Sequence, residues 1–179
     1  INFANMFFGA SSFNQDIGDW NVSSGTNLSD MFQQASAFNQ DIGNWDVSKV
    51  SDFRWVFYEA TNFNGDIGGW DLSSANNLSS LFWEATSFNQ DIGEWNLSSV
   101  KNINGLFYGA SSFDKNIGSW DVSNITNFSW AFYGATEFNQ NIASWDVSSG
   151  TTFSEMFHSA QNFNNDLIVW NIDLSASID

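Results

Sequence analysis

Residues 26–50 read TNLSDMFQQASAFNQDIGNWDVSKV and residues 51–75 read SDFRWVFYEATNFNGDIGGWDLSSA, and the two stretches align without a gap. The same step of 25 runs through the whole chain of 179 residues, which corresponds to seven repeats and four further residues. Tryptophan recurs at 20, 45, 70, 95, 120, 145 and 170, and phenylalanine recurs at 7, 32, 57, 82, 107, 132 and 157 and again at 13, 38, 63, 88, 113, 138 and 163. A fixed internal period of this length predicts a solenoid, in which each repeat stacks on its neighbours.

Each repeat contains the patterns of one short helix and one short strand. The spacing i, i+3, i+4 and i+7, which marks one face of a helix, is occupied by Leu28, Met31, Phe32 and Ala35. Residues 45–47 alternate apolar, polar and apolar, which predicts a short strand. One repeat is too small to bury its own Trp and two Phe side chains, so we expect the stacked copies to bury them in one continuous column.

Two motifs in each repeat carry a family resemblance. The string FNQDIGNWDVS runs from Phe38 to Ser48, and the predicted helix ends in the pattern Met-Phe-x-x-Ala. Ile42-x-x-Trp45-x-Val47 has, in addition, the apolar spacing L-x-x-L-x-L of a leucine-rich-repeat strand. These motifs resemble the 25-residue mycoplasma-type repeats of unknown function, which are grouped with the BspA-type leucine-rich-repeat surface proteins. The resemblance covers essentially the whole chain.

The resemblance implies a right-handed solenoid with a parallel sheet of short strands on one face and helices on the other. We therefore expect an α/β repeat fold: a leucine-rich-repeat-like solenoid of seven 25-residue repeats, each with a short strand and a short helix, forming a single domain over residues 1–179. The resemblance also implies an extracellular or cell-surface setting with adhesion or partner binding, and it offers no catalytic residues. Because the chain begins at Ile1 rather than at a methionine, we expect it to be a piece of a longer protein.

The composition excludes several classes of partner and site. Twenty acidic side chains against four basic ones give a net charge of −16, which disfavours nucleic acid and anionic membrane surfaces. The chain has no run of apolar residues long enough to span a bilayer, so we expect no membrane insertion within it. Cysteine is absent, which excludes disulfide bonds and cysteine-ligated zinc. The aromatic content of 18% predicts a packed core rather than a disordered acidic tail.

Three polar columns follow from the repeat. The first, at Asn14 and its equivalents with Asp114 in the fifth copy, is predicted to be structural, because side-chain amides can bond the backbone of an adjacent turn. The second consists of Asp16, Asp41, Asp66, Asp91, Asn116, Asn141 and Asp166, and the third of Asn21, Asp46, Asp71, Asn96, Asp121, Asp146 and Asn171. We consider Asp16, Asp41, Asp66 and Asp91 as candidate calcium ligands, because calcium favours carboxylate oxygens. The alternative, which we favour, is that both acidic columns form turns.

A stripe of aromatic residues is the candidate binding surface. On the predicted helix, Trp55 and Trp130 lie about 160° from the buried Phe57 and Phe132, which places them near solvent. The position after the buried Phe carries a second aromatic row, which gives the candidate set Trp55, Tyr58, Trp83, Tyr108, Trp130 and Tyr133. Contiguous apolar patches mark interaction sites. The alternative is that the tyrosine row packs between neighbouring repeats as a second core layer.

The sequence favours a non-enzymatic protein, because almost every polar residue recurs seven times and no copy has a distinct acid–base set. We expect a binding or adhesion module for a protein or glycan ligand, without a cofactor. The alternative is a structural unit of an extracellular fibre that self-associates end to end or laterally. A remote third is an ice-binding face at the hydroxyl row that starts at Ser11. Glycan acceptor motifs, relevant only in a eukaryotic secretory pathway, occur at Asn21, Asn27, Asn77, Asn96, Asn124 and Asn127.

Overall fold

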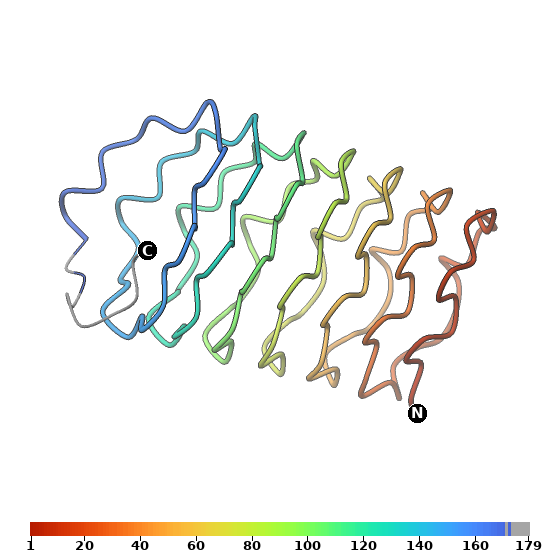
Figure 1. Cartoon of the computed structure of the whole chain (residues 1–179). Helices are drawn as coiled ribbons and strands as arrows, with labels where there is room; N and C mark the ends of the chain where they lie inside the picture. Colours follow the sequence, from red (N-terminus) through yellow and green to blue (C-terminus); the bar gives the residue numbers. More distant parts are fainter. Residues whose placement is uncertain (171, 173–179) are drawn as a thin grey trace.

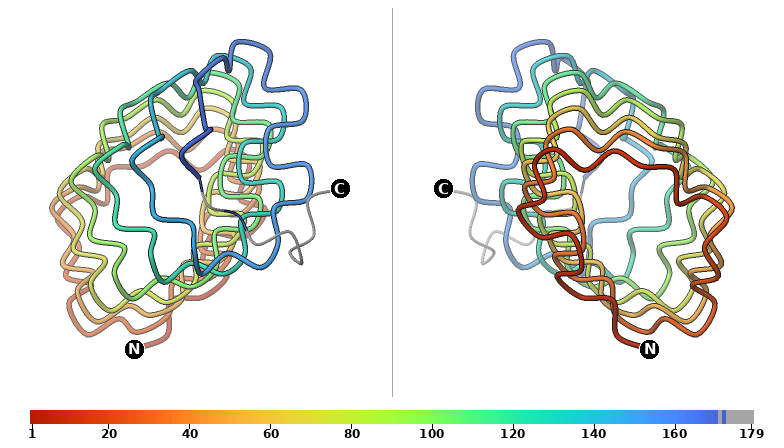
Figure 2. Two further views of the ribbon diagram at one scale, coloured as in Figure 1. Left: turned by 90° about the vertical axis from the view of Figure 1, so that its left-hand side faces the viewer. Right: turned by 90° about the vertical axis from the view of Figure 1, so that its right-hand side faces the viewer.

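The computed structural model describes residues 1–170 and 172, and residues 1–170 form one continuous stack of coils (Figure 1). Coil 1 comprises residues 1–25, coil 2 residues 26–50, and so on to coil 7, which is described from residue 151 to residue 170. In the two end-on views of Figure 2, successive coils lie nearly on top of one another around a shared interior. The predicted stacking of 25-residue repeats is therefore what the chain adopts over its described residues.

The predicted secondary structure is wrong. Among residues 1–170 and 172 there is no α-helix and no β-strand, and each coil is built from turns. The only ladder contacts in this part of the chain are isolated parallel bridges between the second residues of successive coils: Asn2, Asn27, Asp52, Asn77, Asn102, Asn127 and Thr152. The α/β fold class, the short strand at residues 45–47, the parallel sheet and the leucine-rich-repeat assignment are thereby overturned.

Overlapping turns replace the predicted helix. In coil 1 the N–H groups of Met6, Phe8 and Ala10 donate to the carbonyl oxygens of Phe3, Asn5 and Phe7, each three residues earlier. The fifth residue of a coil, such as Trp55, and the ninth, such as Glu59, have positive φ values. A right-handed helix has negative φ at every residue, whereas a type II turn requires a positive φ at its third residue. Residues with positive φ therefore recur four positions apart in this segment, and they prevent a helix from forming.

The alternate N–H groups of this segment bond to the next coil. Phe3, Asn5, Phe7 and Gly9 donate to the carbonyl oxygens of Asn27, Ser29, Met31 and Gln33, at N···O distances of 3.0, 3.0, 2.8 and 2.8 Å. Equivalent bonds recur between the coils that follow, up to Gly134 and His158. Backbone donors are thus shared between the turns of one coil and the carbonyl groups of the next, which satisfies them without a helix or a sheet.

The core is the predicted continuous stack of Phe and Trp side chains. Equivalent Phe rings stack from coil to coil, as between Phe57 and Phe82, whose centroids are 5.7 Å apart and whose planes differ by 3°. The two Phe rings of one coil also stack, with centroids 3.8 Å apart for Phe82 and Phe88. The indole Nε1 of Trp95 donates to the carbonyl oxygen of Ile67 at 3.1 Å, and this bond recurs for Trp45, Trp70, Trp120, Trp145 and Trp170. Each of these six Trp side chains therefore packs in or against the core and ties its coil to an earlier one.

The asparagine column is structural, as predicted. The Oδ1 atom of Asn64 accepts the backbone N–H of Asn89 at 2.8 Å, and Asn39 bonds the backbone of Asn64 in the same way. In coil 5 the acceptor is a carboxylate oxygen, because Asp114 accepts the N–H of Asn139 at 3.0 Å. The column therefore uses a side-chain oxygen at each step to satisfy an amide of the following coil.

Candidate functional site

The first acidic column forms turns. The Oδ1 atom of Asp16 accepts the backbone N–H of Gly18 at 3.0 Å, and Asp66 and Asp91 make the same bond within their own coils. Asp41 instead accepts the N–H of Asp66 at 2.9 Å. Among the residues that the structure describes, no group of three or more His, Asp and Glu side chains is placed to hold a metal ion. The geometry therefore supports the turn-forming interpretation of the candidate calcium ligands.

The second acidic column also forms turns, and here the carboxylates gain an additional partner. Asp121 Oδ1 accepts both the backbone N–H of Ser123 at 3.1 Å and its hydroxyl at 2.6 Å. The hydroxyl bond, followed by the amide bond, lowers the pKa of Asp121 below its usual value, and the same causes lower the pKa of Asp46, Asp71 and Asp146. Asn171, the last member of this column, lies outside the described residues.

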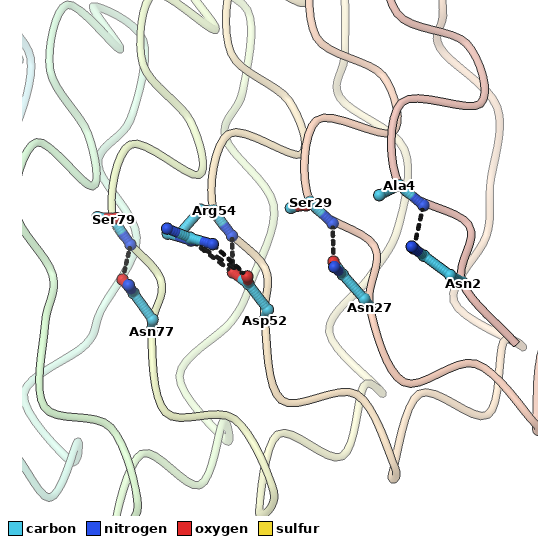
Figure 3. Close-up of polar contacts among 8 residues, drawn as sticks. All are labelled: Asn2, Ala4, Asn27, Ser29, Asp52, Arg54, Asn77 and Ser79. Carbon is cyan, nitrogen blue, oxygen red and sulfur yellow. Dashed lines mark hydrogen bonds and ion pairs between the residues drawn. The ribbon is translucent and has the colours of Figure 1, made fainter.

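A third row of turns lies at the bridge positions, which sequence reasoning did not single out as a column (Figure 3). Asn27 Oδ1 accepts the backbone N–H of Ser29 at 2.7 Å, and Asn77 accepts that of Ser79 at 2.9 Å. In coil 3 the acceptor is Asp52, which also pairs with the Arg54 guanidinium at 2.7 Å. Side-chain turns at up to three positions of a coil thus account for most of the repeated Asn and Asp residues.

The potential glycan acceptors fall into two groups. Asn27, Asn77 and Asn127 are half-buried, and their side-chain oxygens accept backbone amides in the row just described. Asn21, Asn96 and Asn124 are exposed, and the Nδ2 atom of Asn124 donates to the carbonyl oxygen of Ser98 at 2.9 Å. The second group is the more accessible to a modifying enzyme.

The hydroxyl row considered for ice binding also bonds within the protein. Thr136 Oγ1 donates to the carbonyl oxygen of Ser111 at 3.2 Å, and Thr86 donates to that of Thr61 at 3.3 Å. The row therefore contributes to the contacts between coils, and it offers fewer free hydroxyl groups than the sequence pattern suggests.

The aromatic row forms a second stack on the surface, which we call the aromatic column: Tyr58, Trp83, Tyr108, Tyr133 and His158. The tightest contact is between Trp83 and Tyr108, whose centroids are 3.6 Å apart and whose planes differ by 3°. The ring centroids of Tyr58 and Trp83 are 5.7 Å apart, and those of Tyr108 and Tyr133 are 4.5 Å apart. The column packs between coils and is half-buried except at His158, so it combines a second layer with an accessible edge.

Trp55 and Trp130 are exposed, as predicted, although not on a helix. Their side chains are 38% and 39% exposed, and both have a φ of 59° at the fifth position of a coil. The Arg54 guanidinium lies 5.3 Å from the ring centroid of Trp55. The indole of Trp130 lies at 86° to that of Trp83, with centroids 6.5 Å apart. Trp130 therefore stands beside the aromatic column rather than within it.

Two hollows flank the central pair of the column. A groove of about 690 Å³ is lined by Gln34, Ser36, Glu59, Thr61, Trp83, Glu84 and Tyr108. A smaller hollow of about 190 Å³, which we call the aromatic pocket, is lined by Trp83, Tyr108, Trp130, Tyr133 and Glu155. Both hollows share Trp83 and Tyr108 as walls. The structure thus brings together four of the six candidate binding residues around one pocket, and it places Trp55 and Tyr58 outside that pocket.

Carboxylates accompany the aromatic rings. Burial, with a smaller contribution from the charge of Glu59, raises the pKa of Glu84. Burial also raises the pKa of Tyr108, and electrostatic interactions with Tyr133, Glu84 and Glu155 raise it further. Gln34 donates its side-chain amide to Glu59 at 3.0 Å. A Cβ atom on Gly109 would lie 2.6 Å from the carboxyl carbon of Glu84, so this glycine provides the space in which the carboxylate lies.

Sequence reasoning missed Glu59, Glu84 and Glu155. They occupy the two left-handed positions of their coils, which carry Asn, Asp, Ser, Gln, Gly or Trp in other copies. Charged or aromatic residues are uncommon with positive φ, whereas Gly and Asn adopt it readily. The appearance of these side chains at positions that elsewhere hold Gly or Asn is the signal that could have identified them.

The comparisons with known proteins give one family. Among residues 1–170 and 172 no helix has the length and apolar character needed to cross a membrane. No curated protein and no solved structure shows significant similarity to the chain. The chain matches the family described as Mycoplasma protein of unknown function, DUF285, over residues 1–95 and again over residues 76–178. These two matches span almost the whole sequence, and the chain therefore belongs to the DUF285 family of Mycoplasma proteins of unknown function.

Proposed function

We propose that this chain is a non-enzymatic binding module at the cell exterior, and that it holds a protein or glycan partner at the aromatic column and the two hollows beside it. The grouping with BspA-type surface proteins and the organisation of residues 1–179 as one domain are part of this proposal. The observation that carries it is that Trp83, Tyr108, Tyr133 and Trp130 line one pocket on a single face, with Glu155 beside them.

Residues that recur in every copy and residues that differ between copies have different roles, and this difference supports the proposal. The repeated Asn and Asp side chains accept backbone amides, and the repeated Phe and Trp rings fill the core. The hollows, by contrast, are lined mostly by residues that differ from one copy to the next. Aromatic side chains in well-packed pockets supply most of the binding energy at protein interfaces. A set of residues that departs from the repeated sequence and gathers on one face is thus suited to recognition.

Two substitutions test the surface while respecting its backbone. Coil 1 has Asn5 with a φ of 62° at the position of Trp55 and Trp130, so Trp55→Asn and Trp130→Asn keep a residue that tolerates this conformation. Protein and glycan arrays probed with the unmodified chain should give a ligand that the Trp130→Asn variant binds at least about tenfold more weakly. Trp55→Asn shows whether the partner extends beyond the pocket.

The matched control is Phe8→Gln. Phe8 is 51% exposed at the same position in coil 1 as the aromatic column, and coil 2 carries Gln33 at that position. We expect this variant to bind the array ligand like the unmodified chain. Absence of any ligand, or equal binding by the Trp130→Asn and unmodified proteins, would contradict the proposed surface. Antibody labelling of intact cells tests the exterior location separately.

Self-assembly is the second candidate function. It is favoured by the contacts between coils, because the same backbone bonds recur at every junction from coil 1 to coil 7. A coil from another copy that presents the same groups would meet the same set of partners. Sedimentation velocity and electron microscopy at increasing concentration test it, and particles that stay monomeric at the highest concentration would argue against assembly.

A further inference from the structure

We propose that the aromatic pocket binds a quaternary ammonium group, such as the trimethylammonium of choline or of a methylated lysine. This inference rests on the proposed binding function and adds the chemical class of the ligand. Three features of the pocket support it: the ring geometry, the surrounding charge and the volume of the hollow.

The ring geometry leaves one indole available to a cation. Tyr58 and Tyr108 stack on the two faces of Trp83. Trp83 therefore contacts Trp130 through the edge of the Trp83 indole. Trp130 stands at 86° to Trp83 and has no stacked neighbour in the described residues, and it is 39% exposed. A cation is attracted to the negative face of an aromatic ring, and Trp gives the strongest attraction.

The charge of the pocket is complementary to a cation. Glu155 lines the pocket itself, and Glu84 lies across Trp83 and Tyr108 in the adjoining groove. None of the four basic side chains of the chain lines either hollow, and the net charge of −16 adds a negative field around them. An anionic ligand would therefore be repelled, whereas a cationic one would be attracted by Glu155.

The mix of rings and carboxylate favours a methylated ammonium over a bare one. A primary ammonium is strongly hydrated and needs several acceptors to replace its water. The pocket supplies four aromatic side chains, two of them with hydroxyl groups, and one carboxylate, so a cation there would meet ring carbons and a single negative charge. A quaternary ammonium donates no N–H hydrogen bonds, so it needs only apolar contact and the negative ring face that Trp130, unlike the stacked rings, has available.

The size of the pocket fits a head group rather than a whole ligand. Its volume of about 190 Å³ lies below the 300 to 1,000 Å³ that is usual for sites of drug-sized molecules. The adjoining groove of about 690 Å³ shares two walls with it. The pocket is thus sized for the cationic end of a molecule whose remainder extends along the groove or into solvent.

The test uses choline chloride as the probe, followed by tryptophan fluorescence and by saturation-transfer NMR of the choline methyl protons. We expect saturable binding by the unmodified chain. The neutral carbon isostere of choline, in which a carbon atom replaces the nitrogen, should bind at least about tenfold more weakly, because it keeps the shape and loses the charge. Equal binding of the two compounds, or no saturable binding of choline, would overturn the proposal.

Three variants locate the binding. Trp130→Asn removes the free indole and Glu155→Gln removes the charge, and each should weaken choline binding about tenfold. Phe8→Gln, outside both hollows, should bind choline like the unmodified chain. Far-ultraviolet circular dichroism and the melting temperature of each variant show that it is folded. Unchanged affinity of the folded Trp130→Asn variant would overturn the assignment to this pocket.

Two further arms identify the source of the group and separate the two proposals. A peptide with one trimethyllysine is compared with the same peptide carrying an unmodified lysine; preference for the methylated form supports the pocket and indicates a protein ligand, whereas equal affinity for both overturns the ammonium preference. Choline is also added to the array experiment. An array ligand lost in Trp130→Asn but not displaced by choline would overturn the ammonium site while leaving the binding surface in place.

Discussion

The indole of Trp83 occupies the space that a side chain at Gly105 would need, since a Cβ atom on Gly105 would lie 2.8 Å from both Cε3 and Cζ3 of the ring. Gly105 has a φ of 60° and is buried, and it belongs to the coil that follows Trp83. The coil after Trp83 therefore leaves room for it to lie flat on Tyr108. Both hollows depend on this placement, because Trp83 is a wall of each.

Replacing that glycine tests the dependence. We expect Gly105→Ala to lower the free energy of unfolding by more than the roughly 1–2 kcal/mol that a left-handed alanine costs, because the indole must also move. The variant should change the near-ultraviolet circular dichroism of the Trp83–Tyr108 pair. Gly9→Ala is the matched control, since Gly9 has a φ of 69° and no atom within 4 Å of an added Cβ. Equal losses for the two variants would show that Trp83 does not need the space.

The groove should make stability depend on pH through Glu84. Its pKa is raised above the ordinary value of 4.5, so the folded state binds this proton more tightly than the unfolded state. The resulting stabilisation is present below pH 4.5 and is lost as the pH rises through the folded-state pKa. We expect Glu84→Gln to raise the midpoint of chemical denaturation at pH 7 and to lose this advantage under acid conditions. Glu94→Gln, which removes an exposed carboxylate outside the hollows, controls for net charge.

The serine partners of the second acidic column should hold its pKa values down. Ser123→Ala removes the 2.6 Å hydroxyl bond to Asp121, which is the largest cause of its lowered pKa, and leaves the amide bond in place. We expect the pKa of Asp121, measured by carbon NMR, to rise towards the ordinary value of 3.8 in this variant. The pKa of Asp46, in another coil, serves as an internal reference and should stay unchanged. A fixed pKa for Asp121 would show that the hydroxyl does not stabilise its charge.

The asparagine column should require an oxygen rather than an amide. Asn64→Ala leaves the backbone N–H of Asn89 without its acceptor, and we expect a loss of about 1–3 kcal/mol in the free energy of unfolding. Asn64→Asp keeps an oxygen in place, as Asp114 does in coil 5, and should be much less destabilising. Urea denaturation of the two variants side by side measures the difference. Similar losses would indicate that the amide nitrogen of Asn64 is needed as well.

The period predicts side-chain positions better than it predicts the backbone. Leu28, Met31, Phe32 and Ala35 are all buried, as their spacing indicates, yet they lie on turns and not on a helix. A helix and this series of turns produce the same spacing of buried residues, because Asp30 and Gln34 adopt positive φ while the neighbouring side chains still point inward. Apolar periodicity alone cannot separate them, since it reports which residues face the core and not how the amides between them are satisfied.

The candidate site was predictable in part for a similar reason. The rings of Trp83, Tyr108, Trp130 and Tyr133 stand out in the sequence because they interrupt an otherwise regular repeat. Their meeting at one pocket was not predictable, because Trp130 lies two coils after Trp83 and approaches it only through its perpendicular orientation. The contribution of Gly105 depends on contact with a side chain of the preceding coil, which no local pattern records.

The alternate N–H groups on the turn face give the stack a direction. Four peptide groups in each of coils 1 to 6, those of residues 3, 5, 7 and 9 and their equivalents, donate towards the C-terminal end, so their dipoles align and add along that face. Other backbone bonds between coils, such as Thr26 to Ile1 and Ala37 to Ser11, point the opposite way and are fewer. Any coil that joins the stack by these bonds, whether from this chain or from a second copy, must run in the same sense. Copies that associate by these bonds would therefore form polar, head-to-tail assemblies, because two N-terminal ends would set acceptors against acceptors and two C-terminal ends would set donors against donors.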